Sequence, residues 1–239
     1  MARFLVYNLA IMPSRKQKII AVAIAATLLA AIAGYWLYRE HQKRVLRDTV
    51  TAWIIDAGTQ LRAALGVEPG AATADEEETI KSLEARTEAV AKNRAALRDR
   101  DGAPQRPLVD AADHYLLTVS EILRQHAATR RHGHYTTIGL RELWEHMGGR
   151  YSQGLGWTTE ALRRKELLEK EYFQYRIAAE ALARLLEGYP EDRVRVMPFV
   201  DAVKLPDEKL TRAARTRALE AAKRLAAEME RLRKLPGDR

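Results

Sequence analysis

The chain has 239 residues, 47% of them hydrophobic, which is enough for a packed core and excludes disorder throughout. Its composition is typical of helices, because alanine, leucine, arginine and glutamate are abundant while glycine and proline number only 13 and 8. The absence of cysteine excludes a disulfide framework, a thiolate metal site and a cysteine nucleophile.

The net charge of +8 has a local origin. Four basic residues lie in the first 18 positions without an acidic residue, and they account for half of the excess: Arg3, Arg15, Lys16 and Lys18. Further along, basic and acidic residues are interspersed, as on solvated helix faces. We therefore expect no nucleic-acid partner.

Residues 19–38 read IIAVAIAATLLAAIAGYWLY and contain no charge. This is about the length that a helix needs to cross a hydrocarbon core of roughly 30 Å. The segment predicts a transmembrane helix with the lipid bilayer as partner, preceded by a short basic tail at 1–18. The expected membrane-interface residues are Lys18, Tyr35, Trp36, Tyr38 and Arg39.

Two alternatives to a retained signal anchor are open. The basic, apolar and small residues before Gly34 also fit a cleavable secretory signal, and a buried helix of a soluble protein is the third interpretation. The signal anchor is favoured because apolarity continues through residues 34–38. The start is open as well, since Met12 is a second candidate initiator and residues 1–12 suggest no function.

The charges that flank the span nearly balance, so the positive-inside rule alone does not set the orientation. Export of a short basic tail is unfavourable, whereas long domains are translocated largely regardless of charge. We therefore expect a single-pass protein of a bacterial inner membrane, with a cytoplasmic amino terminus and the remaining chain in the periplasm.

After the span, the pattern predicts an all-α fold. Residues 39–66 extend the spanning helix as a stalk or first bundle helix, and residues 67–239 form the remaining bundle. Apolar residues at three-four spacing predict an antiparallel, coiled-coil-like bundle of about four to five long helices. The seams are Leu46, Val50, Trp53, Ala57, Leu61 and Ala64; Ile80, Leu83, Thr87, Val90 and Leu97; Leu108, Ala112, Tyr115, Val119, Ile122 and His126; Leu168, Tyr172, Tyr175, Ala179, Leu182 and Leu186; and Ala214, Ala218, Ala221, Leu225, Met229 and Leu232.

Breaks separate these helices. Breaks are expected after Gly66, at 99–107, at a polar and aromatic excursion over 130–158, and at 189–208, where three prolines should end the fourth seam. Within the last break, the apolar residues 196–200 are expected to dock across the bundle. The helix before residues 148–149 should end there, with a restart near Thr158 or Thr159.

The chain offers little that is typical of catalysis. Residues 149–156 have the glycine spacing of a phosphate-binding loop, but Leu155 and Gly156 replace its lysine and hydroxyl residue. Histidines and glutamates at 142–146 lack the spacing of known metal motifs, so neither a metal nor another cofactor is expected. His126 lies on an apolar seam, where a hydrogen-bonded core histidine is the expected role.

The best candidate for a ligand or partner surface combines arginine with aromatic residues, which are common binding anchors. Its members are Arg130, Arg131, His132, His134, Tyr135, Trp144, Arg150, Tyr151 and Trp157. Aromatic packing onto the end of the bundle is the competing interpretation, and the favoured one. The sequence thus predicts a non-catalytic, membrane-anchored interaction or scaffold module that binds another envelope protein or a second copy. A ligand-sensing ectodomain that depends on a partner for output is the alternative.

Overall fold

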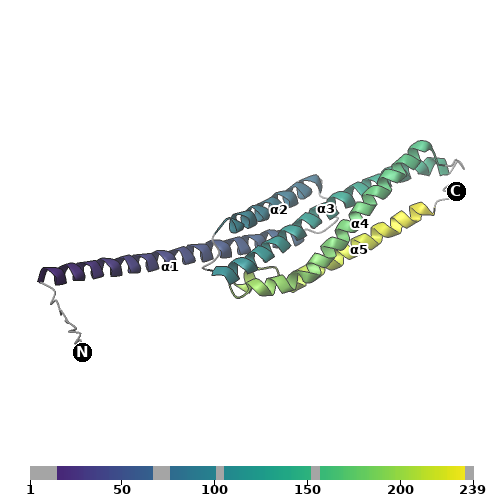
Figure 1. Cartoon of the computed structure of the whole chain (residues 1–239). Helices are drawn as coiled ribbons and strands as arrows, with labels where there is room; N and C mark the ends of the chain where they lie inside the picture. Colours follow the sequence, from purple (N-terminus) through teal and green to yellow (C-terminus); the bar gives the residue numbers. More distant parts are fainter. Residues whose placement is uncertain (1–14, 67–75, 101–104, 152–156, 235–239) are drawn as a thin grey trace, which may run out of the picture. The chain divides into compact units, whose positions relative to one another are not determined.

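The structure, a computed structural model of the whole chain, describes residues 15–66, 76–100, 105–151 and 157–234. Within a helix, the side chains of 15–22, 25 and 148–151 are outside this description. The described elements are all helical and include no strand, which confirms the all-α prediction. They are α1 Arg15–Leu65, α2 Glu76–Arg98, α3 Arg106–Tyr151, α4 Thr159–Val196, the short 3-10 helix η2 Ala202–Lys204, and α5 Glu208–Arg233 (Figure 1).

The chain divides into two compact units, Met1–Leu46 and Arg47–Arg239. In the first unit, the described side chains from Ala23 to Tyr38 are all exposed. Among residues whose side chains are described, no helix is both long and apolar enough to cross a membrane. Residues 19–22 and 25 of the expected span, and the whole tail at 1–18, lie outside that set. The expected transmembrane helix is therefore not part of what the structure establishes.

In the second unit, α2 to α5 form an antiparallel bundle, with α3 packed against both α2 and α4, and α5 packed against α4 (Figure 1). Contacts between neighbouring helices run in opposite chain directions. They are Glu76–Arg130 and Arg94–Asp113 for α2 and α3, Gly133–Tyr175 and Gly139–Leu168 for α3 and α4, and Arg215–Glu187 and Arg233–Glu169 for α4 and α5. The last residues of α1 join this bundle, since Gln60 accepts a hydrogen bond from Arg86 of α2.

The core follows the predicted seams closely. All six members of the α3 seam and all six members of the α4 seam are buried, and so are five of the six α1 positions. Gly133 of α3 brings α4 close, because a Cβ placed there would lie 3.0 Å from the Tyr175 ring. A larger side chain at this position would therefore push the two central helices apart.

Most predicted helix ends are also observed. α1 ends at Leu65, one residue before Gly66, and α4 begins at Thr159. The side chain of Thr158 accepts a hydrogen bond from the amide of Ala161, and Asp207 caps α5 in the same way by accepting from Leu210. Both caps satisfy backbone donors that the first helical turn leaves unpaired.

Two predictions were wrong. Pro190 does not end α4, which continues to Val196, because Leu186, Tyr189 and Val196 are buried on both sides of the proline and hold the helix through the lost backbone bond. Similarly, no excursion begins at Arg130. The helix α3 continues to Tyr151, because Leu140, Leu143 and Met147 bury a further apolar stripe against α4 and α5. In these two places tertiary burial outweighs local signals.

Segment 196–200 also differs from the prediction. Val196 is the last residue of α4, and the next four residues form a turn in which only Val200 is buried. The turn leads into η2. Arg62 of α1 holds this segment in place by donating hydrogen bonds to the carbonyl oxygens of Val203 and Leu205, at 2.7 and 2.8 Å. These polar contacts and the burial of Val200 and Leu205 together hold this connection, while most of the apolar run does not dock.

Candidate functional site

The seven residues of the predicted ligand surface whose side chains are described do not converge on one site. Arg130 to Trp144 lie on α3 over nearly four helical turns and face different neighbours. Arg131 forms an ion pair with Glu84 of α2, whereas the Nδ1 atom of His132 lies 2.8 Å from Glu171 of α4. The rings of His134 and Tyr135 contact each other at a centroid distance of 5.7 Å. The first two contacts tie α3 to its neighbours and the third lies within α3, and the described residues form no common cleft.

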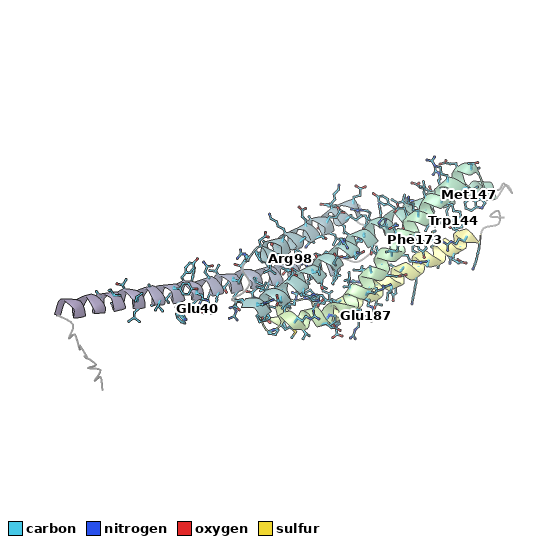
Figure 2. All side chains as sticks on the ribbon, viewed as in Figure 1. Glu40, Arg98, Trp144, Met147, Phe173 and Glu187 are labelled. Atoms are coloured by element: carbon cyan, nitrogen blue, oxygen red, sulfur yellow. The ribbon has the colours of Figure 1, made fainter. Side chains whose placement is uncertain are left out.

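The aromatic members lie nearer the end of α3. Trp144 and Trp157 are half-buried against an apolar cluster that includes Leu143, Met147 and Met229 (Figure 2 labels Trp144 and Met147). The ammonium of Lys165 lies 5.1 Å from the centroid of the Trp157 ring. For these two tryptophans, packing onto the bundle describes the surroundings better than a ligand cleft does. The side chains of Arg150 and Tyr151 lie outside the described residues.

A different group of polar residues, two of them buried and two half-buried, lies where four helices meet. Arg130 forms a two-pronged ion pair with Glu76, the first residue of α2, with Nε–Oε1 and Nη2–Oε2 distances of 2.6 and 2.9 Å. His126 is one turn before Arg130 on α3, and Arg217 of α5 donates to the carbonyl oxygen of Leu65 at the end of α1. We call Glu76, His126, Arg130 and Arg217 the polar cluster.

Burial and charge both act on this cluster. Hydrogen bonding from Arg130 lowers the pKa of Glu76, so the carboxylate stays ionised. Desolvation by burial, reinforced by the positive charges of Arg130 and Arg217, lowers the pKa of His126 to about 4. At neutral pH the cluster therefore contains two guanidinium cations, one carboxylate and a neutral imidazole.

Several donors in the cluster are unsatisfied. The Nδ1 atom of His126, Nη1 of Arg130 and Nε of Arg217 are buried and have no hydrogen-bond partner among the residues that the structure describes. The prediction of a hydrogen-bonded core histidine at 126 therefore fails at Nδ1. Sequence reasoning did not identify the cluster, although a signal existed: Arg130 follows His126 by four residues and so continues the buried seam of α3 with a charge.

A second buried network lies toward the start of α3. The hydroxyls of Tyr115 and Tyr189 are 3.1 Å apart, and the Asp192 carboxylate accepts hydrogen bonds from Thr118 and His114 at 2.6 and 2.9 Å. Burial raises the pKa of Tyr115 to about 12, so its hydroxyl stays protonated. The network joins α3 to the end of α4 and aligns these two helices.

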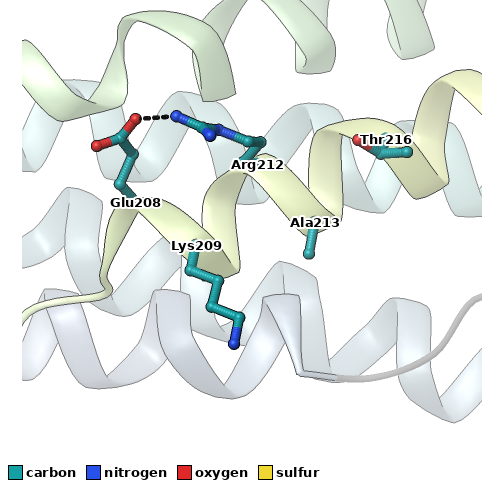
Figure 3. A pocket seen from close by; sticks show the side chains of 5 residues that line it. All are labelled: Glu208, Lys209, Arg212, Ala213 and Thr216. Atoms are coloured by element: carbon teal, nitrogen blue, oxygen red, sulfur yellow. Dashed lines mark hydrogen bonds and ion pairs between the residues drawn. The ribbon is translucent and has the colours of Figure 1, made fainter.

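Within the described part of the chain, no three histidines or acidic residues are grouped closely enough to hold a metal ion. A depression of about 580 Å³ lies on the surface of α5. It is lined by Glu208, Lys209, Arg212, Ala213 and Thr216 (Figure 3). Glu208 and Arg212 pair with each other across its wall, and all five side chains are exposed. It is an open surface feature without buried polar groups that would bind a ligand.

No protein-family model, curated protein or solved structure matches this chain. Fold and geometry therefore define a class only: an all-α bundle with a long first helix, two buried polar networks and a heavily charged surface.

Proposed function

We propose that the protein is a membrane-anchored helical-bundle module that binds other proteins of a bacterial envelope, rather than an enzyme. One observation carries this proposal. α1 is a single helix of 51 residues, and it exposes large apolar side chains in its first half while its later residues, from Val50 to Leu65, contribute to the core.

The exposed apolar side chains in the first half of α1 need a nonpolar environment. They are Ile24, Leu28, Leu29, Ile32, Tyr35, Trp36, Leu37 and Tyr38. Exposure of one such side chain to water costs about 1.5–3 kcal/mol relative to its burial. A hydrocarbon core around residues 19–38 would remove this cost, and the aromatic rings at 35, 36 and 38 favour the interface. In this arrangement Lys18 and Arg39 border the span.

We place the amino terminus in the cytoplasm and the bundle in the periplasm of a bacterial inner membrane. The short tail contains uncompensated basic residues, whose export is unfavourable. A long domain of mixed charge, in contrast, is translocated largely regardless of its charge. Val203 is 79% exposed on η2 and suits a labelling test, since the chain has no cysteine of its own. A Val203→Cys variant should react with a membrane-impermeant maleimide in intact cells. Labelling only after lysis would reverse the topology.

The anchor is tested by membrane extraction. The full chain should stay with the membrane pellet in alkaline carbonate, whereas a Leu28→Arg/Ile32→Arg variant should move to the soluble fraction, because two buried arginines are costly in hydrocarbon. Val203→Arg, which adds a charge at an exposed apolar residue elsewhere, is the matched control and should stay in the pellet. Release of the unmodified chain by carbonate would refute the anchor.

The interaction role is tested separately in native extracts. Membranes solubilised in mild detergent should contain the chain in an assembly heavier than its own mass of 27.1 kDa, after correction for bound detergent. A species that contains one copy and nothing else would contradict a role in binding proteins.

A second candidate function, ligand sensing, is favoured by the polar cluster alone. Its two unpaired guanidinium donors and its excess of one positive charge would suit a small anion. Acetate or inorganic phosphate should then raise the melting temperature of the full chain at constant ionic strength. The Arg217→Met variant should lose this rise. An equal melting temperature with and without either anion would eliminate this candidate.

A further inference from the structure

The outward face of α4 has a regular pattern of which the bundle uses only one end, where Glu187 pairs with Arg215 of α5. Its side chains lie opposite the buried seam and are all exposed, and they are spaced by three and four residues in strict alternation. The members are Arg163, Glu166, Lys170, Phe173, Ile177, Glu180, Arg184 and Glu187. We call this stripe the α4 outer seam (Figure 2 labels Phe173 and Glu187).

The centre of the α4 outer seam is apolar. Phe173 and Ile177 lie on adjacent turns of the helix. Their side chains are 51% and 49% exposed, although both are large and apolar. The three residues on either side of this pair are charged. Apolar centres within charged rims are typical of protein interfaces.

The charges on the two sides are complementary in reverse order. From the centre outward, the sequence of signs is positive, negative, positive on the amino-terminal side, and negative, positive, negative on the carboxyl-terminal side. A second α4 helix that lies antiparallel across the first therefore places Lys170 opposite Glu180, Glu166 opposite Arg184, and Arg163 opposite Glu187. The same operation sets Phe173 against Ile177 of the other copy.

We propose that the α4 outer seam pairs with the same seam of a second copy of this chain, in an antiparallel arrangement around a two-fold axis between Phe173 and Ile177. An axis of this kind makes the surface self-complementary, as the commonest homodimers require. Parallel pairing in register would instead set each charge against itself. The proposal rests on the interaction role given above and names the partner for it.

Existing contacts leave most of the seam free to pair. Glu166 and Lys170 take part in no ion pair with another described residue, and Arg184 reaches only Glu180 of its own helix, at 3.6 Å. Glu187 at the edge of the seam pairs with Arg215 of α5 at 3.0 Å, so this residue would have to exchange partners. Exposed ion pairs of this kind are weak and exchange easily. The charges would therefore select the partner and the direction, while burial of Phe173 and Ile177 would supply most of the affinity.

Cross-linking tests the antiparallel direction. Two differently tagged full-length chains, Arg163→Cys and Glu187→Cys, are mixed in detergent and treated with a short bifunctional maleimide. The seam spans 25 residues, roughly 36 Å at 1.5 Å per residue, so only the mixed pair brings two cysteines together. We expect cross-linked heterodimers and no homodimers. Homodimers alone, or no cross-link at any concentration, would overturn the proposal. Val203→Cys on both chains is the control for random collision.

Charge exchange tests the specificity of the pair. Lys170→Glu and Glu180→Lys should each weaken the dimer about tenfold by light scattering or sedimentation, because each sets like charges together at two symmetric places. The double variant, which exchanges the two residues within one chain, should restore the affinity of the original chain. Circular dichroism checks that all three variants remain helical. A double variant as weak as the singles would refute the pairing, whereas the extraction and native-mass tests would still report on the anchor and on other partners.

Discussion

Two stretches of α3 are equally buried but differ in chemistry. Around residues 126–130 the core contains His126 and Arg130, with Glu76 and Arg217 from two other helices. Farther along the same helix, Leu140, Leu143 and Met147 pack into a cluster that is apolar apart from the edges of its aromatic rings. One helix therefore stabilises the bundle by two means, ionic pairing in the first stretch and loss of apolar surface in the second.

The comparison separates two roles, fixing the alignment of the helices and stabilising the bundle. An apolar stripe tolerates small shifts along the helix, whereas a two-pronged pair between Arg130 and Glu76 is satisfied at a single alignment. The first stretch should therefore be the more sensitive to charge and pH, and the second to side-chain volume. Substitutions in each stretch can break or sharpen this distinction.

The largest expected effect is from Arg130→Ala. It leaves the half-buried Glu76 carboxylate, whose side chain is 21% exposed, without its partner, at a cost of about 3–5 kcal/mol in the free energy of unfolding. Arg131→Ala is the matched control, because the neighbouring pair with Glu84 is solvent-exposed and should cost less than about 1 kcal/mol. Urea denaturation of both variants measures the two values, and equal losses would refute a special role for the buried pair.

Next in size is Leu143→Ala in the apolar stretch. The side chain is fully buried, so truncation should leave a cavity and cost about 2–5 kcal/mol. The loss should be the same at pH 7 and pH 5, since no charge is involved. Leu162→Ala, at an exposed position of α4, is the control and should change the midpoint of urea unfolding only slightly.

Acidification should weaken the polar stretch selectively. His126 has a pKa of about 4 in the folded chain against an ordinary value of 6.5, so the unfolded chain binds its proton first. The contribution of neutral His126 to the free energy of unfolding is fully present above pH 6.5. It declines as the pH falls toward 4, by about 3 kcal/mol in total. His126→Gln should remove this part of the pH dependence. An unchanged slope between pH 6.5 and 4.5 in this variant would show that other groups cause the decline.

The smallest expected effect is from Thr158→Ala at the start of α4. The variant loses the hydrogen bond from the Ala161 amide and should cost about 1 kcal/mol. Thr158→Ser keeps the acceptor and should retain most of the stability. Thermal melts of the three proteins distinguish the cap from a simple packing effect, in which serine and alanine would behave alike.

Much of the fold could be predicted from periodicity and punctuation. The seams at three-four spacing identified the buried faces, since a core-facing stripe needs this spacing, and residues such as Gly66 and Thr158 marked helix ends by their backbone preferences. Pro190 and the stretch after Arg130 misled the prediction for one reason. Their local signals are worth a few kcal/mol at most, and burial of several large side chains on α3 and α4 exceeds them.

The candidate site was less accessible to prediction. Arg130 was identified as a ligand-binding candidate, but its partner Glu76 is 54 residues away and on another helix, and periodicity does not identify such pairs. Arg131 and His132 were grouped with it because they are adjacent in sequence. On a helix, adjacent residues point about 100° apart, so each met a different neighbour.

The buried tyrosines Tyr115 and Tyr189 allow unfolding of the protein to be followed by its ultraviolet absorbance. Both phenols are held protonated, and so is Tyr175, because burial raises the pKa of each. Ionisation of a phenol to phenolate in alkaline solution changes its near-ultraviolet absorbance. The buried phenols should add a separate, abrupt rise when the bundle opens. A simple alkaline titration would then follow the unfolding of the core around α3 and α4 without any added label.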